Sequence, residues 1–243
     1  MTRISGSSKH LRTSGDPYVK REDGVTEALL ITIDGPSGAG KSTAGRALAK
    51  RLGCNYIDTG ALYRGVAYES KRAGIRPNDD EGLKRLCAGL DLSFSIGESG
   101  LRLMSGGNDI TDSIRSSEIA MDASTVSAQP SVRSYLLTLQ RRLAQHKRAV
   151  FEGRDMGTVV FPDADVKFYL DASLNIRAKR RYDELRKHST RTLQEVETDL
   201  KKRDEQDRTR ALSPLKPAKD AVRIDSSGLT LDEVVDTMIA CIR

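Results

Sequence analysis

The octapeptide GPSGAGKS at residues 35–42 constrains the fold more than any other stretch of this chain. Gly35, Gly40, Lys41 and Ser42 have the spacing G-x-x-x-x-G-K-[ST]. The apolar run ALLITID precedes the octapeptide, and an apolar pattern of helical period follows it in TAGRALAKRL. A chance glycine-rich turn rarely has all four residues and both flanking elements. The stretch therefore predicts a phosphate-binding P-loop between a strand and a helix.

The residue types of this loop suit the binding of a nucleoside triphosphate with Mg²⁺. Glycines let the backbone N–H groups approach phosphate oxygens, and the N-terminus of the following helix adds a positive dipole. Lys41 is expected to reach the β- and γ-phosphates of ATP, and the Ser42 hydroxyl to bind Mg²⁺. The loop residues predicted to surround ATP are Gly35, Pro36, Ser37, Gly38, Ala39, Gly40, Lys41, Ser42 and Thr43.

The rest of the chain has the alternation of an α/β protein. Apolar runs of four to seven residues are ALLITID, CNYID, RAVFEG, VKFYLD and AVRID, and longer segments of helical period separate them. This pattern predicts a five-stranded parallel sheet with flanking helices. Thr230 and Glu233 have the spacing of a capping box, which predicts the start of a last helix.

One segment departs from this rhythm and predicts a small antiparallel insertion. Apolar residues alternate with polar ones from Leu90 to Ile96, the sequence GESG follows, and the alternation resumes at Leu101 and Leu103. Two strands joined by a turn explain this pattern.

Arginines gather near the ends of the predicted strands. They occur in DTGALYR, EGRDMG and RDEQDRTR, and parallel strands bring their carboxyl ends to one edge of a sheet, where ligands bind. Arg203, Asp207 and Arg210 would share one face of a helix, which suits either a sugar phosphate or a plain surface ion-pair ladder. Arg177 and Arg181 are also four apart, and they fit a lid that meets the triphosphate about as well as a solvated helix face.

Four stretches together resemble the bacterial cytidylate kinases: ITIDGPSGAGKST, DTGALYRGVA, FEGRDMGTVVFPDADVKFYLDAS and RDEQDRTRALSPLKPAKDAVRIDSSGLTLDEVV. The resemblance runs from about Leu30 to the C-terminus. The antiparallel insertion also resembles an extra three-stranded sheet of that family. The fold that the resemblance implies is a P-loop nucleoside monophosphate (NMP) kinase with a β insertion and a helical lid.

The resemblance also implies a division of the chain. The core would comprise residues 27–60, 148–175 and 211–243. An NMP-binding domain would span 61–147, with the β insertion near 89–111, and the lid would span 176–210. Residues 1–26 are polar and are predicted to be a disordered tail.

The resemblance further implies how CMP or dCMP would be bound. The cytosine would be read by Ser124, Arg133 and Asp155, the phosphate by Arg64, Arg154 and Arg210, and the ribose by Arg203 and Asp207. The matching lid arginines are Arg177 and Arg181, with Arg177 on ATP, and residues 212–218 would lie near the adenine. The catalytic set would be Lys41, Arg64, Arg154, Arg181 and Arg210.

Three further residues are weaker candidates for the site. Thr59 and Tyr63 would lie beside the acceptor pocket, although Tyr63 fits a packed helix residue equally well. Glu152 would either hold a water of the Mg²⁺ ion or pair with an arginine.

Composition limits the other possibilities. The net charge of +6 suits anionic small substrates as well as nucleic acid, but only 5% of residues are aromatic, which disfavours an RNA-binding module that uses ATP as a switch. The three cysteines and three histidines are scattered, so no disulfide framework or metal cluster is predicted. Without an apolar run near 20 residues, we expect a cytoplasmic protein with no membrane or specific nucleic-acid partner. The resemblance implies a monomer that phosphorylates CMP or dCMP, with a kinase for UMP or AMP as the alternative.

Overall fold

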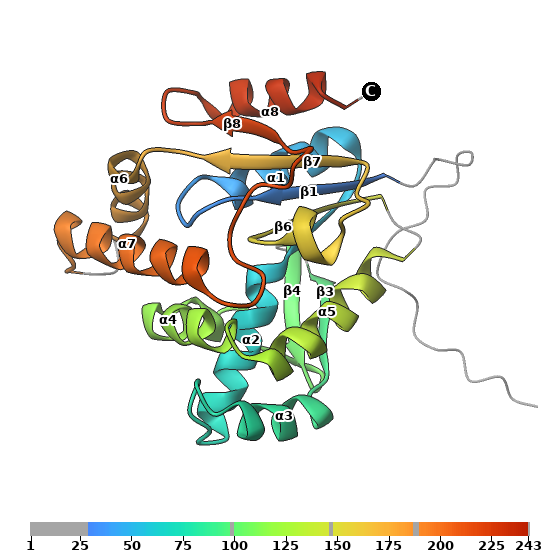
Figure 1. Ribbon diagram of the computed structural model, residues 1–243, viewed down its shortest axis with the longest axis vertical. Coiled ribbons are helices and arrows are strands. Elements are labelled where there is room, and N and C mark those ends of the chain that lie inside the picture. The colour runs from blue at the N-terminus through green and yellow to red at the C-terminus, as the bar shows by residue number, and fades with distance from the viewer. Residues whose placement is uncertain (1–28, 98–99, 146–147, 187–189, 243) are drawn as a thin grey trace, which may run out of the picture.

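The computed structural model describes residues 29–97, 100–145, 148–186 and 190–242. Its centre is a five-stranded parallel sheet with the strand order β2-β6-β1-β7-β8 (Figure 1). The strands are β1 (Leu30–Asp34), β2 (Asn55–Asp58), β6 (Ala149–Gly153), β7 (Val166–Asp171) and β8 (Val222–Asp225). The predicted fold class is therefore confirmed, and the predicted tail at 1–26 lies outside the described residues.

Helices cover both faces of this sheet, which explains why its strands read as continuous apolar runs. Ile31, Ile33 and Phe168 belong to a core formed with α1 (Lys41–Leu52) and α8 (Leu231–Ala240). Phe151 belongs to the core on the opposite face. All four side chains are at most 1% exposed, and each such burial contributes about 1.5–3 kcal/mol. The α8 helix begins with the predicted capping box.

The second core belongs to the segment between β2 and β6, drawn below the sheet in Figure 1. Its helices are α2 (Thr59–Arg72), α3 (Asp80–Gly89), α4 (Ser117–Val126) and α5 (Pro130–Ala144), with a 3₁₀ turn at Ser113–Arg115. Their apolar faces pack on one another and on the sheet.

The predicted antiparallel insertion is a three-stranded sheet of β3 (Leu92–Gly97), β4 (Gly100–Ser105) and the short β5 (Asn108–Asp109). Leu92 and Leu103 pack against α2 at Gly65, where a Cβ would lie only 2.9 Å from the Leu103 side chain. Ile96 differs from the alternation: it pairs with Leu101 near the hairpin tip and is 52% exposed. Residues 98 and 99 of the predicted turn lie outside the described residues.

Two helices flank the carboxyl edge of the parallel sheet. They are α6 (Leu174–Leu185) and α7 (Leu193–Thr209), and they pack together through a small core that includes Ala178, Val196 and Leu200 (Figure 1). A π-helical turn at Met156–Val160 follows β6. Among the described residues, no helix is long and apolar enough to cross a membrane.

Candidate functional site

The P-loop connects β1 to α1 in a conformation that only glycine adopts easily. Gly38 and Gly40 have φ values of 77° and 89°, and Gly40 is the N-cap of α1. At Gly35 a Cβ would lie 1.9 Å from the carbonyl oxygen of Leu170 on β7. No side chain caps α1 and its first turn has no acidic residue, so its N–H groups are available to an anion.

Lys41 lies buried at the start of α1, and its Nζ donates a hydrogen bond of 2.8 Å to the carbonyl of Pro36. Burial, and then the charge of the nearby Arg154, lower the pKa of Lys41 to about 7. A buried cation without a full counter-charge is costly, so an anionic ligand at this position would be bound favourably.

Glu152, at the end of β6, is hydrogen-bonded to the first turn of α1 and to β2. Glu152 Oε1 accepts hydrogen bonds from Ser42 Oγ at 2.6 Å and from the Tyr56 phenol at 2.7 Å. Glu152 Oε2 is buried and has no hydrogen-bond partner in the described part of the chain. Burial, and then the charge of Asp58, raise the pKa of Glu152. A serine hydroxyl and an unpartnered carboxylate oxygen are ligands that suit Mg²⁺, directly or through water, so these residues fit that ion.

The sequence did not identify Tyr56 as a site residue. Its hydrogen bond to Glu152 forms only because β2 pairs with β6, and no local sequence pattern predicts that contact. Thr59 is brought to the same place: its hydroxyl donates to the Glu152 carbonyl at 2.6 Å, and the residue is 1% exposed. It lies in the wall of the cavity described below, but its hydroxyl is already engaged by the backbone.

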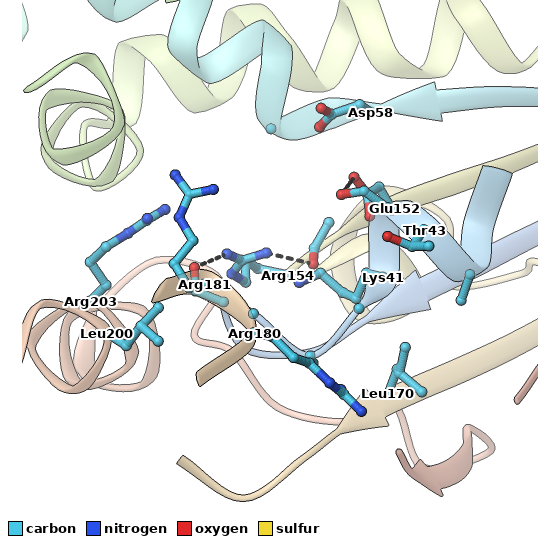
Figure 2. A pocket seen from close by; sticks show the side chains of 18 of the residues that line it. Lys41, Thr43, Asp58, Glu152, Arg154, Leu170, Arg180, Arg181, Leu200 and Arg203 are labelled. Carbon is cyan, nitrogen blue, oxygen red and sulfur yellow. Dashed lines mark hydrogen bonds between the residues drawn. The ribbon is translucent and has the colours of Figure 1, made fainter. Parts of the chain in front are cut away.

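The loop and this cluster open into one cavity of about 1050 Å³ (Figure 2). Most of the sequence-predicted site residues line it, and they come from α1, α2, α4, α6, α7 and the end of β6. A cavity of this size can hold two nucleotides end to end. Of the predicted residues, Gly35, Pro36, Arg133 and Arg177 lie behind its surface.

The predicted phosphate arginines are each held by a carboxylate. Arg64 pairs with Asp58 at 2.7 Å. Arg154 donates to Asp207 at 2.8 Å and to the Ser37 hydroxyl at 2.9 Å.

Arg210 lies 3.7 Å from Asp207 and 3.5 Å from Asp155. An anion entering this cluster would meet three preoriented guanidinium groups, with carboxylates holding each in place.

Two further arginines extend into the same space, as Figure 2 shows for Arg181 and Arg203. Arg203 Nε is buried without a hydrogen-bond partner in the described residues. Burial lowers the pKa of Arg203 to about 10, and Arg154, Arg64 and Arg181 contribute in the same direction. The predicted shared face of Arg203, Asp207 and Arg210 does point into the cavity.

Of the predicted base-reading residues, Ser124 and Asp155 line the cavity, and Arg133 lies behind Asp155. Asp155 is 2% exposed and is hydrogen-bonded to Arg133, which also donates to the Ser127 carbonyl at 3.0 Å. Tyr63 lies under Arg133, with its ring centroid 5.9 Å from the guanidinium carbon, and burial raises the pKa of Tyr63 to about 12. The Ser124 hydroxyl donates to Gln206 of α7 at 3.0 Å.

Arg177 does not meet the cavity as expected. Its guanidinium is buried against Asp204 and the backbone of Ser37, because the first turn of α6 packs beneath the P-loop. Arg180, and not Arg177, lines the cavity, and it donates a hydrogen bond to the Ser226 hydroxyl at 3.0 Å.

The segment predicted to lie near the adenine is not part of the cavity wall. Residues 212–218 do not line the cavity, whereas Ser226, Leu229 and Leu231 do, beside Arg180. These residues follow β8, which places them at the carboxyl edge of the sheet.

We compared the chain with a family model, with related sequences and with solved structures. The sequence profile described as cytidylate kinase matches residues 31–243. This chain belongs to the cytidylate kinase family. A cytidylate kinase of Geobacter sp. (strain M21) is 49% identical over 221 residues, which cover 90% of this chain and 93% of that protein.

A second member of the cytidylate kinase family, from Geobacter sulfurreducens, is 49% identical over 216 residues, or 88% of this chain and 93% of its own length. Among solved structures, a gluconokinase from Sinorhizobium meliloti covers 88% of this chain and 91% of its own, with 16% identity and a TM-score of 0.47. The family match covers the P-loop, the arginine cluster and the predicted base-reading residues together.

Proposed function

We propose that this protein transfers the γ-phosphoryl group of MgATP to CMP or dCMP, giving ADP and CDP or dCDP. The observation that carries the proposal is a single cavity that joins the P-loop to the arginine cluster and to Asp155. Membership of the cytidylate kinase family over residues 31–243 supports the choice of acceptor.

The donor would lie with its triphosphate in the P-loop. The backbone N–H groups of the loop and the Lys41 ammonium would bind the β- and γ-phosphates. Ser42, and Glu152 through water, would hold Mg²⁺, which would supply positive charge to neutralise the triphosphate. Arg180 and the apolar Leu229 and Leu231 offer an edge for the adenine.

The acceptor would lie with its phosphate between Arg64, Arg154 and Arg210. Its ribose would contact Arg203 and Asp207, and its base would face Ser124, Arg133 and Asp155. Asp155 can only accept hydrogen bonds when ionised, so it suits the exocyclic amine of cytosine and disfavours the carbonyl that uracil has there.

The reaction itself needs little covalent assistance from the protein. An oxygen of the acceptor phosphate, already anionic, forms the new bond to the γ-phosphorus, while the bond to the β–γ bridging oxygen breaks and its electrons stay on ADP. Lys41, Arg154, Arg181 and Arg210 would offset the repulsion between the two anions and hold them in line.

The division into core, NMP-binding and lid segments remains a prediction. We expect the NMP-binding and lid segments to move relative to the core when the nucleotides bind. We expect a monomer, as the resemblance to the cytidylate kinases implies, and a cytoplasmic location, where both nucleotides are available.

The deciding experiment measures ADP formation from MgATP with CMP, dCMP, UMP and AMP in parallel, with Lys41→Ala as the control. We expect rapid turnover of CMP and dCMP and slower turnover of UMP. Turnover of AMP alone would replace the proposed acceptor, and ATP binding without turnover of any monophosphate would contradict the kinase assignment.

A further inference from the structure

Ser37 of the P-loop is held at three groups by residues outside the loop. Its N–H donates to Asp204 Oδ1 at 3.4 Å, and its carbonyl accepts from Arg177 Nη1 at 3.0 Å. Its hydroxyl accepts from Arg154 at 2.9 Å. Arg154 also belongs to the arginine cluster, so Ser37 connects the loop to the acceptor side as well as to the two flanking helices.

The two residues that hold the Ser37 backbone form a buried ion pair. Arg177 Nη1 lies 2.6 Å from Asp204 Oδ2, and the two side chains are only 5% and 7% exposed. Arg177 Nε also donates to the Ala172 carbonyl at 2.9 Å, which fixes the plane of the guanidinium. Arg177 lies in the first turn of α6 and Asp204 in the second half of α7, so the ion pair connects these two helices next to the P-loop.

A buried ion pair is weak evidence for stability, because the cost of removing two charges from water offsets most of their attraction. Both partners here use remaining hydrogen-bonding capacity on the backbone of the same P-loop residue, Ser37. The loop is also in contact with α6 itself: a Cβ on Gly38 would lie 3.1 Å from the Arg177 Cβ. The pair thus fixes the loop residue that precedes the left-handed turn at Gly38.

We propose that the Arg177–Asp204 pair positions the P-loop for the triphosphate, and that it does so without contacting ATP. The inference rests on the proposed use of MgATP. Because the directions of the loop N–H groups depend on the backbone at Ser37 and Gly38, loosening Ser37 should weaken triphosphate binding. Arg203 and Asp207 share α7 with Asp204, but the groups proposed for the base and most of those for the phosphate lie on α2, α4, α5 and the end of β6, so CMP binding should change less.

The experiment compares Asp204→Asn with wild type by calorimetric binding of MgATP and by the KM values for ATP and CMP. An asparagine can accept from Arg177 or from the Ser37 N–H, but its amide N–H₂ opposes the other donor, so one contact is lost. We expect the Kd and KM for MgATP to rise about tenfold, the size expected for losing a charged hydrogen bond, and the KM for CMP to change less than about twofold.

Two other variants keep the test decisive. Arg177→Lys retains the charge but not the fork, so it should give a smaller shift of the same kind even if Asp204→Asn does not fold. The matched control is Asp220→Asn. Asp220 pairs with the buried Lys167 at 2.6 Å, and neither residue lines the cavity, so this variant should leave both KM values unchanged.

Equal rises in KM for ATP and CMP, or no change in MgATP affinity in either variant, would overturn the positioning role. A wild-type protein that binds MgATP but phosphorylates no monophosphate would contradict the proposed function alone, because the ATP affinities would still test the pair.

Discussion

The donor and acceptor ends of the cavity are built in opposite ways. At the proposed donor end, nine consecutive residues and one helix N-terminus would supply the binding groups, and most of these are backbone N–H groups. At the acceptor end, long side chains from α2, α5, α7 and the end of β6 converge, and carboxylates hold them. The donor end is therefore set by local backbone geometry, whereas the acceptor end depends on ion pairs between distant segments.

This difference has a consequence for ligand binding. An arriving monophosphate has to share or replace the carboxylate partners of Arg64, Arg154 and Arg210, so its net affinity depends on an exchange of ion pairs. The triphosphate would instead meet the N-terminus of α1, which no side chain caps, and Lys41, which donates to a backbone carbonyl. Among the loop N–H groups, that of Ser37 already donates to Asp204. The predictions below act on one end at a time.

Lys41→Ala should have the largest effect, because it removes the buried cation of the donor end. We expect kcat to fall about a thousandfold. Steady-state rates with CMP measure this, and the exposed Lys50→Ala on the same helix should retain wild-type rates. A loss in kcat of less than tenfold would show that the loop N–H groups bind and orient the triphosphate without Lys41.

Asp155→Ala should mainly affect the acceptor end. It removes the acceptor for the cytosine amine and releases Arg133 and Arg210, so kcat/KM for CMP should fall about a hundredfold and for UMP much less. Asp155→Asn presents an N–H₂ group instead and should shift the preference toward UMP. Equal losses for the two pyrimidines would contradict the proposed base reading.

Tyr56→Phe tests whether the donor end depends on one contact between strands. Without the phenol, Glu152 Oε1 keeps only the Ser42 hydroxyl, and a hydrogen bond of this kind contributes about 0.5–1.5 kcal/mol. We expect the Mg²⁺ concentration for half-maximal rate, and the Kd for Mn²⁺ with ATP in the site, to rise about three- to tenfold. Tyr68→Phe on α2 serves as the control, and an unchanged metal requirement would argue against the role of Glu152.

The smallest expected effect is a proton taken up when MgATP binds. The pKa of Lys41 is about 7 in the ligand-free protein, so the group is mostly neutral above pH 7, and phosphate charge would raise its pKa and draw in a proton. Calorimetry at pH 8 in two buffers of different ionisation enthalpy should detect up to about one proton per site. Lys41→Arg stays charged in this range and should take up none.

A linked effect on stability follows with a definite sign. The folded pKa of Lys41 lies below its ordinary value of 10.5, so the unfolded chain binds more protons between about pH 7 and pH 10. The contribution of Lys41 to the free energy of unfolding therefore becomes more favourable to the folded state as the pH rises through this window.

The chain alone was sufficient wherever the information was local. The strand–loop–helix at the P-loop, the five strands of the parallel sheet, the antiparallel insertion and the capping box at Thr230 depend on spacings of two to eight residues, and the structure confirms each. Leu92 and Leu103 of the insertion are buried and pack against α2, whereas Ile96 near the hairpin tip is exposed.

What only the tertiary structure decided is the direction of side chains whose partners are far away in the sequence. Arg177 and Arg181 share a face of α6 by their spacing, but packing of the first turn under the P-loop buries Arg177 with Asp204, whereas Arg180 and Arg181 reach the cavity. Tyr56 gained its contact with Glu152 only when β2 paired with β6. Helical and strand periods determine which residues share a face, and a long polar side chain then turns toward the partner that the assembled fold provides.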